Sequence, residues 1–215
     1  MKRPEFDAGA LPRKGFIENL LKDARKYQAA GIREQVLLSF TTDPYHPGDT
    51  TLTRLTIEIL REHGLAFCVL TKGGTRALRD IDLYWADRDA FASTLTSLED
   101  AFARKWEPHA ALPKDRIKAL KAFHRRGVFT WVSLEPTLDA ESSLAIVERT
   151  HEFVNLYKIG RVNYCPLTKS INWKEYTERM VSLCSRLGVA HYVKKDLQAF
   201  LPEGHSNEMR VIQHH

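Results

Sequence analysis

Short apolar runs recur along this chain, and each ends in polar or charged residues before a helical stretch begins. The runs lie at residues 36–40, 66–70, 90–92, 128–132 and 153–157. This alternation predicts βα units, whose right-handed crossovers produce a parallel sheet. Parallel strands carry their C-terminal ends to one side of the sheet, where barrel enzymes build their sites. The residues expected to converge there are Asp43, Lys72, Ser93, Glu135, and Lys158 or Arg161.

A further apolar run at residues 189–193 brings the strands to about six, which is too few for a closed eight-stranded barrel. An α/β partial barrel and an open doubly wound sheet are the two architectures that fit. Amphipathic periodicity predicts helices at 16–29, 51–63, 75–82, 114–125, 142–150 and 173–187. Residues 1–215 are expected to form a single domain, with an irregular segment at 1–14 and a polar tail at 202–215.

Composition restricts location and partners. No apolar run is long enough to cross a bilayer, and the N-terminal residues do not resemble a secretory signal, so we expect a cytoplasmic protein with no membrane partner. The net charge is +5 and the pI is near 9.1. The basic residues are spread over the predicted helices, which is typical of an ordinary solvated surface; a nucleic-acid partner is the sharper alternative.

The cysteines are few and widely spaced: Cys68, Cys165 and Cys184. An odd, sparse set argues against a disulfide scaffold and favours a reducing compartment. Cys68 and Cys184 lie in apolar contexts and are interpreted as buried small hydrophobes, whereas Cys165 follows a strand end near the predicted site. None has a closely spaced partner, so no metal site made from these cysteines alone is predicted.

Ordered motifs between about residues 30 and 165 resemble the radical SAM superfamily, in particular its spore photoproduct lyase and DNA repair photolyase-like proteins. The motifs are LSFTTDPYHP at 38–47, LTK at 70–72, WEP at 106–108, Arg116 at a helix start, and LEP at 134–136. The first two are the most specific. The resemblance implies a TIM-barrel-like partial (β/α) barrel of the radical SAM type.

The sequence departs from that family at one point. Family members carry a CxxxCxxC motif after their first strand, and its thiolates bind a [4Fe-4S] cluster; the motif does not occur in this sequence. The start of this sequence resembles the segment that follows the motif in family members, so the first strand of the family barrel is expected to be missing here. Radical chemistry is therefore not expected from this chain alone.

The resemblance also implies an S-adenosylmethionine site. Lys72 and Ser93 are expected to bind the methionyl carboxylate, and the backbone of Thr42, Asp43 and Pro44 to face the amino group. For Lys72 a solvated turn lysine is the alternative, and for Asp43 a side chain that caps its own turn.

Glu135 is expected to face the barrel mouth and bind ribose hydroxyls or substrate, unless it is only a turn residue before proline. Arg116 is unfavourable against the dipole of a helix start, which suggests a tertiary partner, although a solvated arginine is the preferred interpretation. Ser39 lies where family members can hold a hydrogen-atom donor. Serine donates a hydrogen atom poorly, which argues against the spore photoproduct reaction itself.

The sequence leaves three functions open. The first is a radical SAM protein that acts on an unknown substrate, with nucleic acid as the candidate. The second is a nucleotide or nucleic-acid binding module on a degenerate barrel, and the third is a metal-independent barrel enzyme that uses Glu135 and Lys72. A missing first strand would expose the edge of the strand at Val36, so we also expect a homodimer through that edge unless residues before Phe16 cover it.

Overall fold

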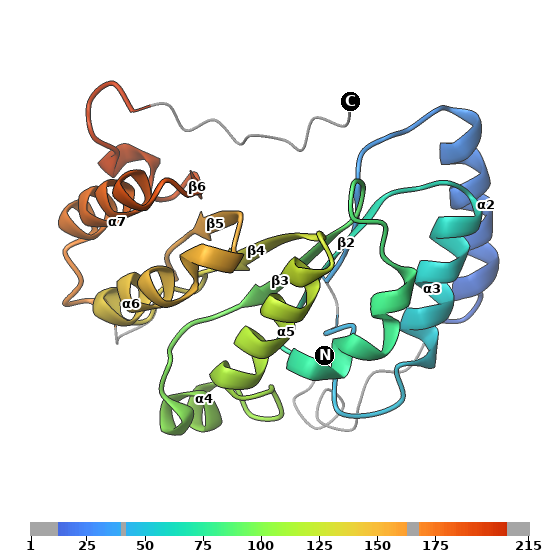
Figure 1. Cartoon of the computed structure of the whole chain (residues 1–215), viewed down its shortest axis with the longest axis horizontal. Helices are drawn as coiled ribbons and strands as arrows, with labels where there is room; N and C mark the ends of the chain where they lie inside the picture. Colours follow the sequence, from blue (N-terminus) through green and yellow to red (C-terminus); the bar gives the residue numbers. More distant parts are fainter. Residues whose placement is uncertain (1–12, 40–41, 163–167, 206–215) are drawn as a thin grey trace.

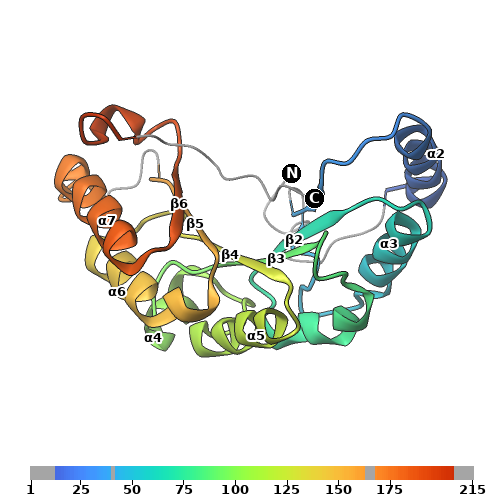
Figure 2. The same ribbon diagram turned by 45° about the horizontal axis from the view of Figure 1, so that its top comes forward.

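The computed structural model of the chain describes residues 13–39, 42–162 and 168–205. Its centre is one sheet of six parallel strands in the order β1-β2-β3-β4-β5-β6. The sheet is curved and open, with the helices on its outer side (Figure 2). The expected α/β partial barrel is therefore confirmed, and an open doubly wound sheet with helices on both faces is excluded. The strands are β1 (Val36–Leu38), β2 (Phe67–Thr71), β3 (Ala90–Thr94), β4 (Phe129–Ser133), β5 (Leu156–Ile159) and β6 (Ala190–Val193).

Helices connect successive strands in the manner of βα units (Figure 1). Sequence signals explain several of their ends: Asp139 caps one helix by accepting from the Ser142 N–H at 2.7 Å, and Gly188 ends another in the left-handed conformation. The α-helices are α2 (Phe16–Ala29), α3 (Thr51–Glu62), α4 (Asp100–Trp106), α5 (Pro113–Arg125), α6 (Ala140–Thr150) and α7 (Trp173–Leu187). The 3₁₀ segments are η1 (Gly74–Leu83), η2 (His151–Phe153) and η4 (Gln198–Phe200).

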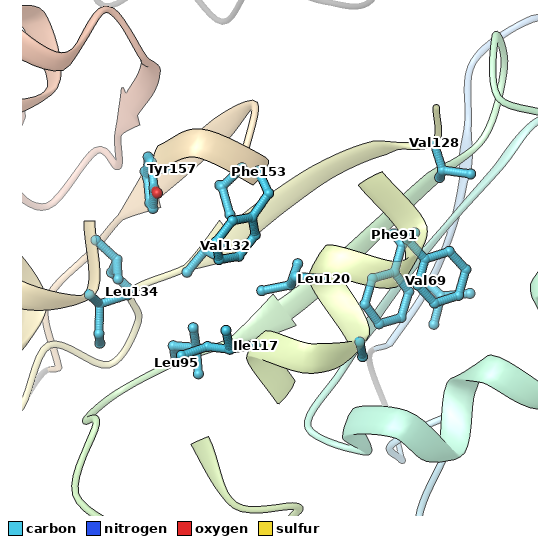
Figure 3. Close-up of a cluster of buried hydrophobic side chains, with 14 of the residues drawn as sticks. Val69, Phe91, Leu95, Ile117, Leu120, Val128, Val132, Leu134, Phe153 and Tyr157 are labelled. Atoms are coloured by element: carbon cyan, nitrogen blue, oxygen red, sulfur yellow. The ribbon is translucent and has the colours of Figure 1, made fainter. Parts of the chain in front are cut away.

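The main core lies between the outer face of the sheet and the helices (Figure 3). Alternate strand residues point outward into it, among them Val69, Phe91 and Val132. The Phe91 ring stacks on that of Phe123 from α5, with 3.9 Å between centroids. Helix α5 thus fixes the middle of the sheet.

The concave face carries a second apolar cluster. Its buried members are Cys68, Ala90, Ala92, Trp131 and Leu156. They come from neighbouring strands, and the register places Ala92 opposite Trp131, and Trp131 opposite Leu156. The two alanines of β3, Ala90 and Ala92, have small side chains and lie in the same cluster as the large indole of Trp131.

The structure corrects some of the sequence-based expectations. Helix α4 was not among the helices that the periodicity predicted, and it buries only Ala103. The helix expected at 75–82 is present, and it is of the 3₁₀ type. The expectations for residues 1–12, 206–215, Phe40 and Cys165 lie outside the described residues. Within the described ranges, no helix is long and apolar enough to span a membrane.

Candidate functional site at the strand ends

Asp43 links the loop after β1 to the end of β2. Its carboxylate accepts from the N–H of Tyr45 at 2.8 Å and from the N–H of Lys72 at 2.6 Å, and it also accepts from the hydroxyl of Thr71. Asp43 therefore caps its own turn, as one of the alternatives held. In addition, it fixes the backbone at Lys72.

Lys72 is the exposed end of three charged side chains in a row, Lys72, Glu107 and Arg116, of which Arg116 is the most buried. Its Nζ lies 2.8 Å from Oε1 of Glu107, and Oε2 of Glu107 lies 2.6 Å from Nη2 of Arg116. These are ion pairs; Glu107 Oε1 and Arg116 Nη2 do not have the alignment of hydrogen bonds. Arg116 is 1% exposed and donates to the carbonyls of Ala111 at 2.7 Å and Thr94 at 2.9 Å. A solvated arginine was the wrong interpretation, and the suggested tertiary partner exists.

The electrostatics of Glu107 follow from this position. Burial alone would raise its pKa, but the charges of Arg116 and Lys72 outweigh burial and hold the pKa below its usual value. Glu107 is therefore ionised at neutral pH. It orients Lys72, whose side chain remains 35% exposed and can reach a ligand.

The two glycines after Lys72 allow its loop to pack closely. A Cβ on Gly73 would lie 2.6 Å from the carbonyl oxygen of Tyr45, and Gly74 has a φ of 59° and faces Asp115. Asp115 accepts from the N–H of Thr75 at 2.9 Å. The loop is thus pinned on both sides, which argues against a freely solvated turn lysine.

An open pocket of about 200 Å³ lies where β1, β2 and β3 end. Its rim combines a cation and a carboxylate with hydroxyl groups and one apolar side chain. The lining residues are Ser39, Thr42, Asp43, Leu70, Thr71, Lys72 and Thr94. Three predicted site residues, Thr42, Asp43 and Lys72, therefore meet here.

Ser93 does not line this pocket. It is fully buried, shares the outer face of β3 with Phe91, and donates to the Thr71 carbonyl at 2.9 Å. The neighbouring Thr94 lies on the concave face and lines the pocket instead. The strand alternation of β3 was the signal that could have identified Thr94.

The loop at Thr42, Asp43 and Pro44 presents fewer free carbonyls than expected. The Asp43 carbonyl accepts from the His46 N–H at 3.3 Å, and the Pro44 carbonyl accepts from the Thr53 hydroxyl at 2.6 Å. The exposed Thr42 is the member of this trio that remains available to a ligand at the pocket rim.

Glu135 lies farther along the sheet, at the end of β4. Its carboxylate pairs with Nζ of Lys194, which follows β6, and the side chain is 34% exposed. A Cβ on Gly160 would lie 3.1 Å from the Glu135 carboxyl carbon, so the carboxylate rests against the backbone after β5. Arg161 pairs with Asp196 at 3.7 Å. Glu135 is thus at the strand ends as predicted, but it does not line the pocket that holds Lys72.

The described residues do not fit an iron–sulfur cluster. Cys68 and Cys184 are buried in different layers of the molecule, and burial raises the pKa of each thiol to about 12. Across the described ranges, no three His, Cys, Asp or Glu side chains are placed to hold a metal ion. The residues that line the pocket fit the amino-acid part of S-adenosylmethionine better than they fit a cluster, because Lys72 offers a cation beside hydroxyl groups.

Comparison with known proteins supports the fold. No family model and no curated protein matches the sequence. Among solved structures, SuiB of Streptococcus suis bound to S-adenosylmethionine is similar, with a TM-score of 0.64 and 12% identity over 86% of this chain and 45% of that chain. A second structure of SuiB has a TM-score of 0.63, the same identity and the same shares.

This chain thus spans less than half the length of SuiB, and at 12% identity the likeness concerns the fold alone. The likeness agrees with the partial barrel that the motifs implied, and it does not single out the spore photoproduct lyase-like subgroup. The architecture is accordingly a partial, TIM-barrel-like (β/α) barrel similar in fold to part of SuiB.

Proposed function

We propose that this chain is a radical SAM protein whose pocket at β1–β3 binds the methionyl end of S-adenosylmethionine. The observation that carries the proposal is Lys72, held by a buried ion-pair chain at the rim of a pocket on a fold shared with an S-adenosylmethionine-bound structure. Bound beside a reduced cluster, this ligand supplies hydrogen-abstraction chemistry.

The side chains have separate tasks in this proposal. The Lys72 ammonium has three donors and pairs with Glu107 as an ion pair, so it can offer donors to the ligand carboxylate. The Thr94 hydroxyl lies on the same rim and can donate to the same group. The Thr42 carbonyl is the acceptor for the ligand ammonium. Asp43 fixes the loop and does not itself bind the ligand.

Cluster thiolates would have to come from outside the described residues. The sequence has no CxxxCxxC, and the two described cysteines are buried. We therefore assign no chemical step to this chain beyond binding and orientation of the ligand. Restoring an upstream CxxxCxxC segment, if the genomic DNA encodes one in frame, would test whether cluster assembly follows.

Calorimetry with S-adenosylmethionine tests the binding proposal directly. Lys72→Met should weaken binding about tenfold or more, since a charge-assisted contact contributes about 1.5–3 kcal/mol. Lys118→Met is the matched control, because Lys118 is exposed on α5 away from the pocket, and it should bind as the unaltered chain does. Equal affinities of the Lys72→Met variant and the control would refute the proposal.

As a second candidate function, we propose a binding module without redox chemistry, whose partner is nucleic acid. Its support is the net charge of +5 and the pI near 9.1. Titration with short single-stranded DNA at several salt concentrations tests it. Affinity that falls steeply with salt, together with no heat from S-adenosylmethionine, would favour this function.

A further inference from the structure

Lys158 is a half-buried cation on the concave face, outside the pocket described above. Its Nζ lies 3.9 Å from the centroid of the Trp131 ring. Among the residues that the structure describes, no carboxylate pairs with it. Burial lowers the pKa of this lysine, because it disfavours the charged form.

A row of polar side chains crosses the sheet at this level. The register pairs Thr94 with Ser133, Ser133 with Lys158, and Lys158 with Tyr192. Residues paired in this way lie on the same face of neighbouring strands, about 4.8 Å apart from strand to strand. Two residues that carry hydroxyl groups, Ser133 and Tyr192, thus flank Lys158 in this row.

The ring under this row is fixed in place. The Trp131 N–H donates to Sγ of Cys68 at 3.1 Å, and Trp131 is 5% exposed. A cation on an indole face gains about 0.5–2 kcal/mol, which is less than a buried charge normally requires. The aromatic contact therefore positions the ammonium group without neutralising it.

Nearby charges do not compensate Lys158 either. At the adjoining strand ends, Glu135 is paired with Lys194 and Asp196 with Arg161. Each of these pairs is neutral by itself, so among the described residues neither Glu135 nor Asp196 is free to balance the charge of Lys158. A single anionic group would balance it.

We propose that Lys158, Ser133 and Tyr192 bind one oxyanionic group, a carboxylate or a phosphate, of a small-molecule ligand. An ammonium with flanking hydroxyls matches the acceptors of such a group. The row ends at Thr94, which also lines the Lys72 pocket, so the ligand would lie next to that pocket. The identification of this ligand as the substrate rests on the proposed function. The prediction that Lys158 binds an oxyanion does not depend on it.

The test uses the full chain and the NMR signal of the Trp131 indole N–H. Lys158→Met identifies this signal as the indole resonance that it displaces most. Acetate and inorganic phosphate are titrated separately at constant ionic strength. We expect a saturable shift of the Trp131 signal, lost in Lys158→Met and kept in Lys118→Met.

Saturation by acetate alone identifies a carboxylate ligand, by phosphate alone a phosphate ester, and by both a general oxyanion site; each supports the proposal. A linear response to both anions, or a saturable shift that persists in Lys158→Met, overturns it. Lys72→Met should leave these titrations unchanged while it weakens S-adenosylmethionine binding, so failure of one site can be distinguished from failure of the other.

Discussion

Replacing Glu107 by glutamine removes the one negative charge between two cations. Arg116 would remain buried opposite a neutral amide, and breaking a buried ion pair in this way costs about 3–5 kcal/mol. Arg116 keeps its two carbonyl acceptors, and Lys72 is partly exposed, so we place the loss at the lower end, about 3 kcal/mol. For a chain of this size that loss corresponds to a decrease in Tm of about 6–12 °C.

The effect should depend on pH with a defined sign. The pKa of Glu107 is lowered in the folded protein from an ordinary value of 4.5. Its ionised form therefore stabilises the fold fully above about pH 4.5, and that contribution is lost as the pH falls through the lower folded value. The difference in unfolding free energy between the unaltered chain and Glu107→Gln should shrink in the same range.

Urea denaturation at pH 7 and at successively lower pH measures both quantities. Glu62→Gln is the matched control, since Glu62 is exposed on α3, and its effect should remain within about 0.5 kcal/mol. A loss below about 1 kcal/mol for Glu107→Gln at pH 7, or a loss that does not change with pH, would show that the buried chain of charges does not stabilise the fold.

Three further outcomes are expected. Gly73→Ala should destabilise the protein by about 1–3 kcal/mol in urea denaturation, because the added Cβ meets the Cβ and the carbonyl oxygen of Tyr45, whereas Gly31→Ala has free space and only backbone strain. Cys68 and Cys184 should resist a thiol reagent until the protein unfolds, since burial raises their pKa to about 12; rapid labelling of either in the native protein would contradict this. The outer edge of β1 pairs with no strand in the described part of the sheet, so light scattering should detect self-association, and a monodisperse monomer would be evidence against it.

Local sequence patterns were enough to predict the strands and most helices. Helix α7 was predicted with the bounds that the structure has, because a regular apolar face and a terminal glycine define it. Helix α4 escaped prediction because it has only seven residues, and Ala103 is the one that it buries. The strands could be predicted because each is a short apolar run that ends in polar residues.

The site was predicted less completely because its contacts join distant segments. Lys72 and Arg116 both pair with Glu107, on the loop after α4, and no local pattern encodes these contacts. Ser93 was chosen for its position at a strand end, although its alternation with Phe91 placed it on the outer face. Sequence position identified the correct end of the sheet, whereas side-chain direction required the strand register.

The order of the strands has a consequence for how the protein is made. Every pairing in the sheet joins strands that follow each other in the chain, so each unit finds its partner in the segment synthesised just before it. Domains generally fold as units during synthesis, but in the described sheet each strand pairs with its neighbours in the chain and so need not wait for a distant one. We therefore expect ribosome-bound nascent chains to acquire protease resistance stepwise, with a marked gain once α5 has emerged to cover the middle strands.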